Sequence, residues 1–173
     1  MRNFILFLLI LLGLIFPIKT AIRSIEFTQN CGGYLKQAAD ANTINIAKNC
    51  LTKAILYLEE NNLTEGYTSI VYKTPKDDIG FWYNNLSTSL DELLMYSDNL
   101  SPLESSNILL KLRETLLDDT QNGTEITIPP GISRYPNNTL YAIMNALSIA
   151  LLLYFVIKIK MRKVNELAKT IEE

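Results

Sequence analysis

The sequence predicts a mainly α-helical protein, in which a small extracytoplasmic helical bundle lies between an N-terminal signal-anchor and a C-terminal transmembrane helix. Two observations carry this prediction: apolar segments bracket the chain, and helix start signals with apolar residues at three- and four-residue spacing fill the region between them. They divide the chain into a signal-anchor or signal peptide (1–23), an extracytoplasmic domain (24–139), a membrane span (140–157) and a short basic cytoplasmic tail (158–173).

The C-terminal apolar segment runs from Leu140 to Ile157. At 1.5 Å per residue it covers about 27 Å, close to the ~30 Å hydrocarbon core of a bilayer. Positive charge next to a span opposes translocation, so the basic residues that follow are expected to keep the C-terminus in the cytoplasm. These residues are Lys158, Lys160, Arg162 and Lys163. A core helix of a soluble protein would leave that basic cluster unexplained.

The N-terminal apolar segment, Phe4 to Ile18, admits two interpretations. Its length suits either the core of a signal peptide or a short anchor. The best cleavage position follows Ser24, but it places Ile22 where a small residue is needed, so an uncleaved anchor is favoured. Under both interpretations residues 24–139 face outward.

Charge is divided between the two sides of the predicted membrane. Residues 24–139 carry eight basic and fifteen acidic side chains, a net charge of −7, whereas residues 158–173 carry five basic and three acidic ones, a net of +2. An acidic domain repels phosphate backbones, so nucleic acid is not an expected partner. The acidity is better explained by solubility than by cation binding.

Signals for catalysis are scarce. The chain has no histidine, which excludes imidazole catalysis and histidine metal ligands. No G-x-S-x-G, glycine-rich phosphate loop or C-x-x-C occurs. The pairs Asp77-Asp78 and Asp118-Asp119 are explained by a helix start and a turn. We therefore predict no catalytic, metal or cofactor site and no cofactor.

Three helices are expected in the outer domain. The stretch 34–60 contains no Gly or Pro, and it carries an apolar stripe typical of one helix: Ile44, Ala47, Leu51, Ala54 and Leu58. A second helix is expected to begin at Thr74-Pro75-Lys76-Asp77, which places proline and an acid in the first turn. The third begins at Ser101-Pro102-Leu103-Glu104, a capping box. That helix, to about Leu117, is apolar around most of its circumference and is expected to be central.

A minor two-stranded β element is expected after the third helix. Asn122-Gly123 marks a turn, and residues 125–128 alternate in the manner of a strand. The strand is expected to pair with Tyr67–Tyr72. Pro129-Pro130-Gly131 excludes a further helix.

Cys31 and Cys50 lie in the outward segment, where disulfides persist. A bond requires Cα atoms within about 7 Å, but an unbroken helix over 34–60 would hold them roughly 28 Å apart. A break at the polar tract 40–43 would allow a disulfide. The absence of Gly and Pro favours continuity, which leaves three interpretations open: a disulfide, a buried Cys50, or a Cys31 that pairs between chains.

Two groups of residues are candidates for contact with a ligand or partner. Phe81, Trp82 and Tyr83 form the densest aromatic cluster, with Trp82 and Tyr83 expected in the core and Phe81 exposed. In the membrane helix, small and polar residues allow close helix packing: Ala142, Asn145, Ala146 and Ala150. Their partner would be the first span, a second copy or another membrane protein.

These features favour an integral cell-membrane protein with a non-enzymatic interaction or scaffold role. Its expected partners are the lipid bilayer and another membrane protein or a second copy of itself. The alternative is a ligand-sensing or solute-binding ectodomain that signals through a partner. A hydrolase acting on envelope or surface material is the least favoured hypothesis.

Overall fold

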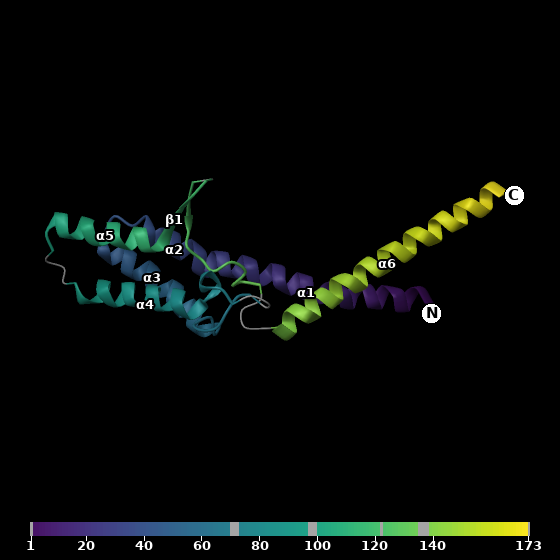
Figure 1. Cartoon of the computed structure of the whole chain (residues 1–173), viewed down its shortest axis with the longest axis horizontal. Helices are drawn as coiled ribbons and strands as arrows, with labels where there is room; N and C mark the ends of the chain where they lie inside the picture. The colour runs from purple at the N-terminus through teal and green to yellow at the C-terminus, as the bar shows by residue number, and fades with distance from the viewer. Residues whose placement is uncertain (1, 70–72, 97–99, 122, 135–138, 173) are drawn as a thin grey trace. The chain divides into compact units, whose positions relative to one another are not determined.

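The computed structural model describes residues 2–69, 73–96, 100–121, 123–134 and 139–172 (Figure 1). Within these ranges, side chains are described outside 2–12, 139–141, 163 and 165–172. The chain is mainly helical, as predicted. It divides into two compact units: Arg23–Asn137, here called the helical unit, and Met1–Ile22 with Asn138–Glu173, here called the paired-helix unit.

The helical unit is a bundle. Its segments are the end of α1 (Arg2–Phe27), a π-helical turn (Thr28–Gly32), α2 (Gly33–Ala39), α3 (Ile44–Glu60), α4 (Ile79–Met95) and α5 (Pro102–Leu116). Helix α3 packs against α2 and α4, and α5 packs against α2 and, less extensively, against α3 and α4. Because α2 and α3 are separate, the prediction of three main helices is wrong.

The polar tract Asp40–Thr43 separates α2 from α3. Thr43 has the extended backbone of an N-cap, and its hydroxyl accepts a hydrogen bond from the Ile46 amide at 3.3 Å. Asp, Asn and Thr side chains compete with the helix for backbone hydrogen bonds, so this tract ends a helix without Gly or Pro. The favoured single helix over 34–60 is therefore wrong.

Helix α3 forms the centre of the core. Its buried side chains are Ala47, Leu51, Ala54, Ile55 and Leu58. The expectation that α5 would be central is wrong, because it buries only Leu112 and Leu116 among the described residues, and Leu103 is 72% exposed. Apolar residues spread around a helix cannot all face one core, whereas the stripe of α3 lies on a single face.

Residues next to the N-termini of α4 and α5 cap these two helices. At α5 the capping box is confirmed: the Ser101 hydroxyl accepts from the Glu104 amide, and the Glu104 carboxylate accepts from the Ser101 amide at 2.9 Å. The expected start at Thr74-Pro75 is a 3₁₀ turn (Pro75–Asp77). Helix α4 begins later, where the Asp78 carboxylate accepts from the Phe81 amide at 3.0 Å.

The β element is a hairpin of β1 (Leu117–Thr120) and β2 (Gly123–Ile126), paired antiparallel. Gly123 has a φ of +118°, a backbone conformation that favours glycine. The expected pairing with Tyr67–Tyr72 is wrong, because Tyr67 forms an isolated bridge with Asp78. Residues 70–72 lie outside the described part of the chain.

The paired-helix unit holds the N-terminal part of α1 and α6 (Thr139–Glu172). Within α6, Ala142–Arg162 has 21 residues and a mean hydropathy of 2.1, so it is long and apolar enough to cross a membrane. Among the described residues it is the only helix that meets this criterion. It includes most of the predicted span 140–157 and extends beyond it.

Candidate interaction site

The β hairpin separates two recesses of the helical unit. In a strand, successive side chains point to opposite faces, so the pairs Leu117–Ile126 and Asp118–Glu125 lie on opposite faces of the hairpin. One recess, here called the charged cleft, is lined by Lys36, Asp40, Arg113, Leu117, Thr124, Glu125 and Ile126. The other is here called the aromatic groove.

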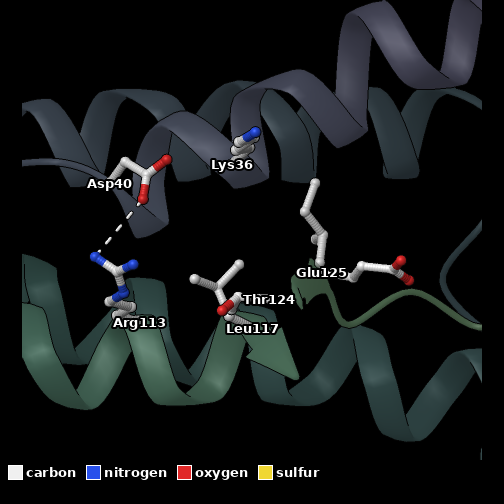
Figure 2. Close-up of a pocket in the computed structure, with 7 residues that line it drawn as sticks. Lys36, Asp40, Arg113, Leu117, Thr124 and Glu125 are labelled. Atoms are coloured by element: carbon white, nitrogen blue, oxygen red, sulfur yellow. Dashed lines mark ion pairs between the residues drawn. The ribbon is translucent and has the colours of Figure 1, made fainter. Parts of the chain in front are cut away.

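The charged cleft has a volume of about 390 Å³ and lies between α2, α5 and the hairpin (Figure 2). Arg113 and Asp40 form an ion pair across it at 3.7 Å, with side chains 53% and 49% exposed. Such an exposed pair contributes about 0–1 kcal/mol. Figure 2 shows the Glu125 carboxylate directed away from Lys36 and Arg113.

The aromatic groove has a volume of about 270 Å³ and lies between the start of α4 and the hairpin. Its lining combines two aromatic rings, three carboxylates, one lysine, and several small polar and apolar side chains. These are Phe81, Trp82, Asp78, Asp118, Glu125, Lys76, Asn85, Thr120, Thr127, Pro75, Ile126, Ile128 and Pro129.

The two aromatic residues of the groove differ in burial. Phe81 is 63% exposed, whereas Trp82 is 6% exposed. The Trp82 Nε1 donates a hydrogen bond to the Thr127 carbonyl oxygen at 2.7 Å. The predicted burial of Trp82 and exposure of Phe81 are thus confirmed, and both residues line one groove.

Tyr83 belongs to a different surface. It is partly buried, and its hydroxyl donates a hydrogen bond to Glu59 Oε1 at 2.7 Å. This hydrogen bond is the largest cause of the raised pKa of Tyr83, and burial adds to it. The structure therefore separates the third member of the aromatic cluster from the other two.

Acidic side chains gather at the hairpin side of the groove. Asp118 and Glu125 stand directly opposite each other in register, and neither has an ion-pair partner among the described residues. Like charges in this arrangement repel each other and destabilise the hairpin. Explaining Asp118 as a turn acid missed this pair, because only the register of the hairpin brings Glu125 opposite it.

Both cysteines are free thiols, so the possible Cys31–Cys50 disulfide is not formed. Cys31 is fully buried, and burial raises its pKa to about 12. Cys50 is partly buried, and its Sγ lies 3.7 Å from Gln37 Oε1 as a hydrogen-bond donor. The buried thiol is therefore Cys31, and in this fold its sulfur has no surface through which it would pair with another chain.

The paired-helix unit has a packing face on α6. The buried residues there are Ala142, Asn145, Ser148 and Phe155, three or seven positions apart and therefore on one side of the helix. A Cβ atom added at Gly13 would lie 3.0 Å from Leu152 Cγ and 3.4 Å from the Ser148 carbonyl, so α1 approaches α6 closely at this glycine. Of the predicted packing residues, Ala142 and Asn145 lie on this face, whereas Ala146 and Ala150 are exposed, and packing of the predicted face against a partner stays a prediction.

The basic residues lie at the C-terminal end of the candidate span. Lys158, Lys160 and Arg162 are exposed, and the Lys158 Nζ lies 5.6 Å from the centre of the Tyr154 ring. The side chain of Lys163 lies outside the described part of the chain. Their role in topology stays a prediction.

The described residues contain no cluster of three or more His, Cys, Asp or Glu that could hold a metal ion. Searches among protein-family models, curated proteins and solved structures find no match to this chain.

Proposed function

We propose that this protein is a membrane-anchored interaction protein without catalytic activity, which presents its helical unit outside the cytoplasm to a protein partner. The observation that carries the proposal is the exposed apolar surface of the candidate span. Its exposed large side chains are Ile143, Met144, Leu147, Ile149, Leu153, Tyr154, Val156, Ile157, Ile159 and Met161. Such a surface is costly in water, and the hydrocarbon core of a bilayer would cover it.

Two features support anchoring by both helices of the paired-helix unit. The basic residues from Lys158 onward favour a cytoplasmic C-terminus. Close packing of α1 on α6 at Gly13 favours a first segment that stays in the mature protein as a second membrane helix. The net charge of −7 over residues 24–139 suits a soluble domain outside the membrane.

The interaction role follows from the aromatic groove. Phe81 offers a large ring to solvent beside Trp82, and exposed aromatic residues are frequent anchors of protein interfaces. Among the described residues, the lining of the groove includes carboxylates but no histidine, thiol or metal cluster. This composition favours binding of a partner over catalysis.

The membrane part of the proposal is tested on the full chain with a C-terminal tag. We expect the protein to stay in the membrane pellet after alkaline carbonate extraction. External protease should cut the helical unit of intact cells and spare the tag. Replacing Lys158, Lys160, Arg162 and Lys163 by Gln should expose the tag to protease while the protein stays in the pellet. Release by carbonate, or a tag digested in the unchanged protein, contradicts the proposal.

A second candidate function, binding of a small solute, is favoured by the charged cleft. Side chains of both charges line it: Lys36 and Arg113 are positive, and Asp40 is negative. A zwitterionic solute such as an amino acid would match this pattern. A thermal-shift screen of amino acids against the full chain tests it, with Arg113→Gln expected to abolish any shift. The absence of a shift with every amino acid contradicts this candidate.

A further inference from the structure

We propose that the aromatic groove binds an arginine side chain presented by the partner protein. This inference rests on the proposed interaction function and names the chemistry of the partner. It is carried by three properties of the groove: an uncompensated pair of carboxylates, an exposed aromatic ring and an apolar floor.

The first property is the charge of the groove. Asp118 and Glu125 face each other across the hairpin, and Asp78 adds a third carboxylate from the start of α4. One oxygen of Asp78 already accepts the Phe81 amide hydrogen bond. Among the described residues that line the groove, Lys76 is the one basic residue. A cation between Asp118 and Glu125 would relieve their repulsion, which gives binding a favourable term that an anion or a neutral group lacks.

The second property is the exposed ring of Phe81. It lies on the same groove as the carboxylates, and its 63% exposure leaves it accessible to a partner. A guanidinium stacks on an aromatic face and donates hydrogen bonds in its own plane. One arginine could therefore stack on the ring of Phe81 and donate hydrogen bonds to the carboxylates at the same time. A lysine ammonium is a point charge that is more strongly hydrated, and a small free cation has no stem to bury.

The third property is the apolar floor. Trp82 lies at 6% exposure with its ring held by the hydrogen bond to Thr127, and Ile128 and Pro129 line the groove beside it. The methylene stem of an arginine would cover this surface while its charged end stays at the acidic rim. The partner segment is therefore expected to carry apolar residues next to the arginine.

The experiment uses the full chain in an uncharged detergent and a fluorescein-labelled peptide with the sequence Gly-Leu-Arg-Leu-Gly. Matched peptides replace arginine by lysine, by glutamate, or by citrulline, which keeps the shape and loses the charge. Fluorescence anisotropy measures the affinity. Trp82 is the only tryptophan of the chain, so its emission, followed with the unlabelled peptide, reports binding at the groove itself.

We expect the arginine peptide to bind and to change the Trp82 emission. The citrulline and glutamate peptides should bind at least tenfold more weakly, since citrulline lacks the positive charge that strengthens hydrogen bonds to the carboxylates and glutamate is repelled by them. The affinity of the lysine peptide should lie between that of the arginine peptide and those of the citrulline and glutamate peptides. Raising the salt concentration should weaken the arginine peptide most.

Three variants locate the binding. Asp118→Asn with Glu125→Gln should weaken the arginine peptide at least tenfold and leave the helical circular dichroism unchanged, because both side chains are exposed. The control, Asp91→Asn with Glu114→Gln, removes the same charge from exposed positions of α4 and α5 outside the groove and should retain the affinity. Phe81→Leu should weaken binding severalfold by removing the ring and keeping an apolar side chain.

The inference is overturned if the arginine peptide leaves the Trp82 emission unchanged, if the citrulline peptide binds equally well, or if the control variant loses as much affinity as the groove variant. Each of these results leaves the membrane proposal standing, because carbonate extraction and protease protection measure anchoring independently. A protein that fails those two assays but binds the arginine peptide at the groove contradicts only the anchoring.

Discussion

The Trp82 indole donates a hydrogen bond to the Thr127 carbonyl at 2.7 Å, across 45 positions of sequence. This bond connects the first turn of α4 to the segment that follows the hairpin. The Thr127 amide in turn donates to the Leu116 carbonyl at 2.9 Å, at the end of α5. The two walls of the aromatic groove are therefore held together at its floor.

Replacing Trp82 by Phe is expected to destabilise the protein by about 1–3 kcal/mol, because the Thr127 carbonyl loses its donor and a smaller ring fills the site. Thermal unfolding of the full chain, followed by circular dichroism in detergent, measures the change. Phe81→Leu is the matched control at the adjacent, exposed position and should stay within about 0.5 kcal/mol. Equal losses in both variants would contradict the assigned role of Trp82.

Replacing Thr43 by Ala is expected to cost about 1 kcal/mol, because the Thr43 hydroxyl caps the start of α3. Thr52→Ala in the interior of the same helix is the control. The Thr52 hydroxyl accepts no cap hydrogen bond and donates to the Lys48 carbonyl at 2.8 Å, so its loss should cost less. Chemical denaturation of both variants tests the difference, and a larger loss at Thr52 would argue against the helix break at Asp40–Thr43.

The two thiols are expected to differ in reactivity. A maleimide at pH 8 should modify Cys50 in the folded protein and reach Cys31 only after denaturation, because Cys31 is fully buried with a pKa of about 12 and thus carries almost no thiolate. Peptide mass mapping after timed quenching identifies the modified residue. Equal rates at both positions, or a disulfide-linked peptide, would contradict the structure.

The Cys31 pKa also predicts a loss of stability at high pH. The ordinary value is 9.0 and the folded value is about 12, so the unfolded chain releases this proton first. The contribution is complete below pH 9 and decreases as the pH rises towards 12. Melting temperatures between pH 8 and pH 11 measure the decrease. Cys31→Ala should show a shallower decrease, and identical slopes would refute the assignment.

A disulfide across the paired-helix unit tests the contact of α1 with α6. In a chain with Cys31→Ala and Cys50→Ser, oxidation should join Gly13→Cys to Leu152→Cys, because a Cβ at position 13 lies 3.0 Å from Leu152 Cγ. Gly13→Cys with Ala146→Cys is the control pair, since Ala146 is exposed and lies off the packing face. Crosslinking in membranes also requires that the first segment is retained. Crosslinking of the control pair alone would show a different packing.

Features encoded by a few adjacent residues were predictable. The capping box at Ser101 and Glu104 requires only residues within one turn, and the sequence pattern identifies it without the rest of the fold. The burial of Trp82 and the exposure of Phe81 follow from their positions around one helix. The stripe on α3 likewise identifies its buried face.

Features that depend on distant packing were not predictable from these signals. Which helix occupies the centre depends on the neighbours of each one, so the apolar circumference of α5 was misleading. The strand at Gly123–Ile126 pairs with the adjacent β1, whereas the more distant Tyr67–Tyr72 had the better strand composition. The groove itself joins α4 to the hairpin through Trp82 and Thr127, and no pattern in either segment indicates the other.

The hairpin gives Asp118 and Thr120 to the aromatic groove and Leu117 and Thr124 to the charged cleft, whereas Glu125 and Ile126 line both recesses. Substitutions at Asp118 would alter the aromatic groove, and substitutions at Thr124 would alter the charged cleft, with the backbone between them unchanged. Selection could therefore alter one recess at a time through these positions, whereas a change at Glu125 or Ile126 would alter both recesses at once.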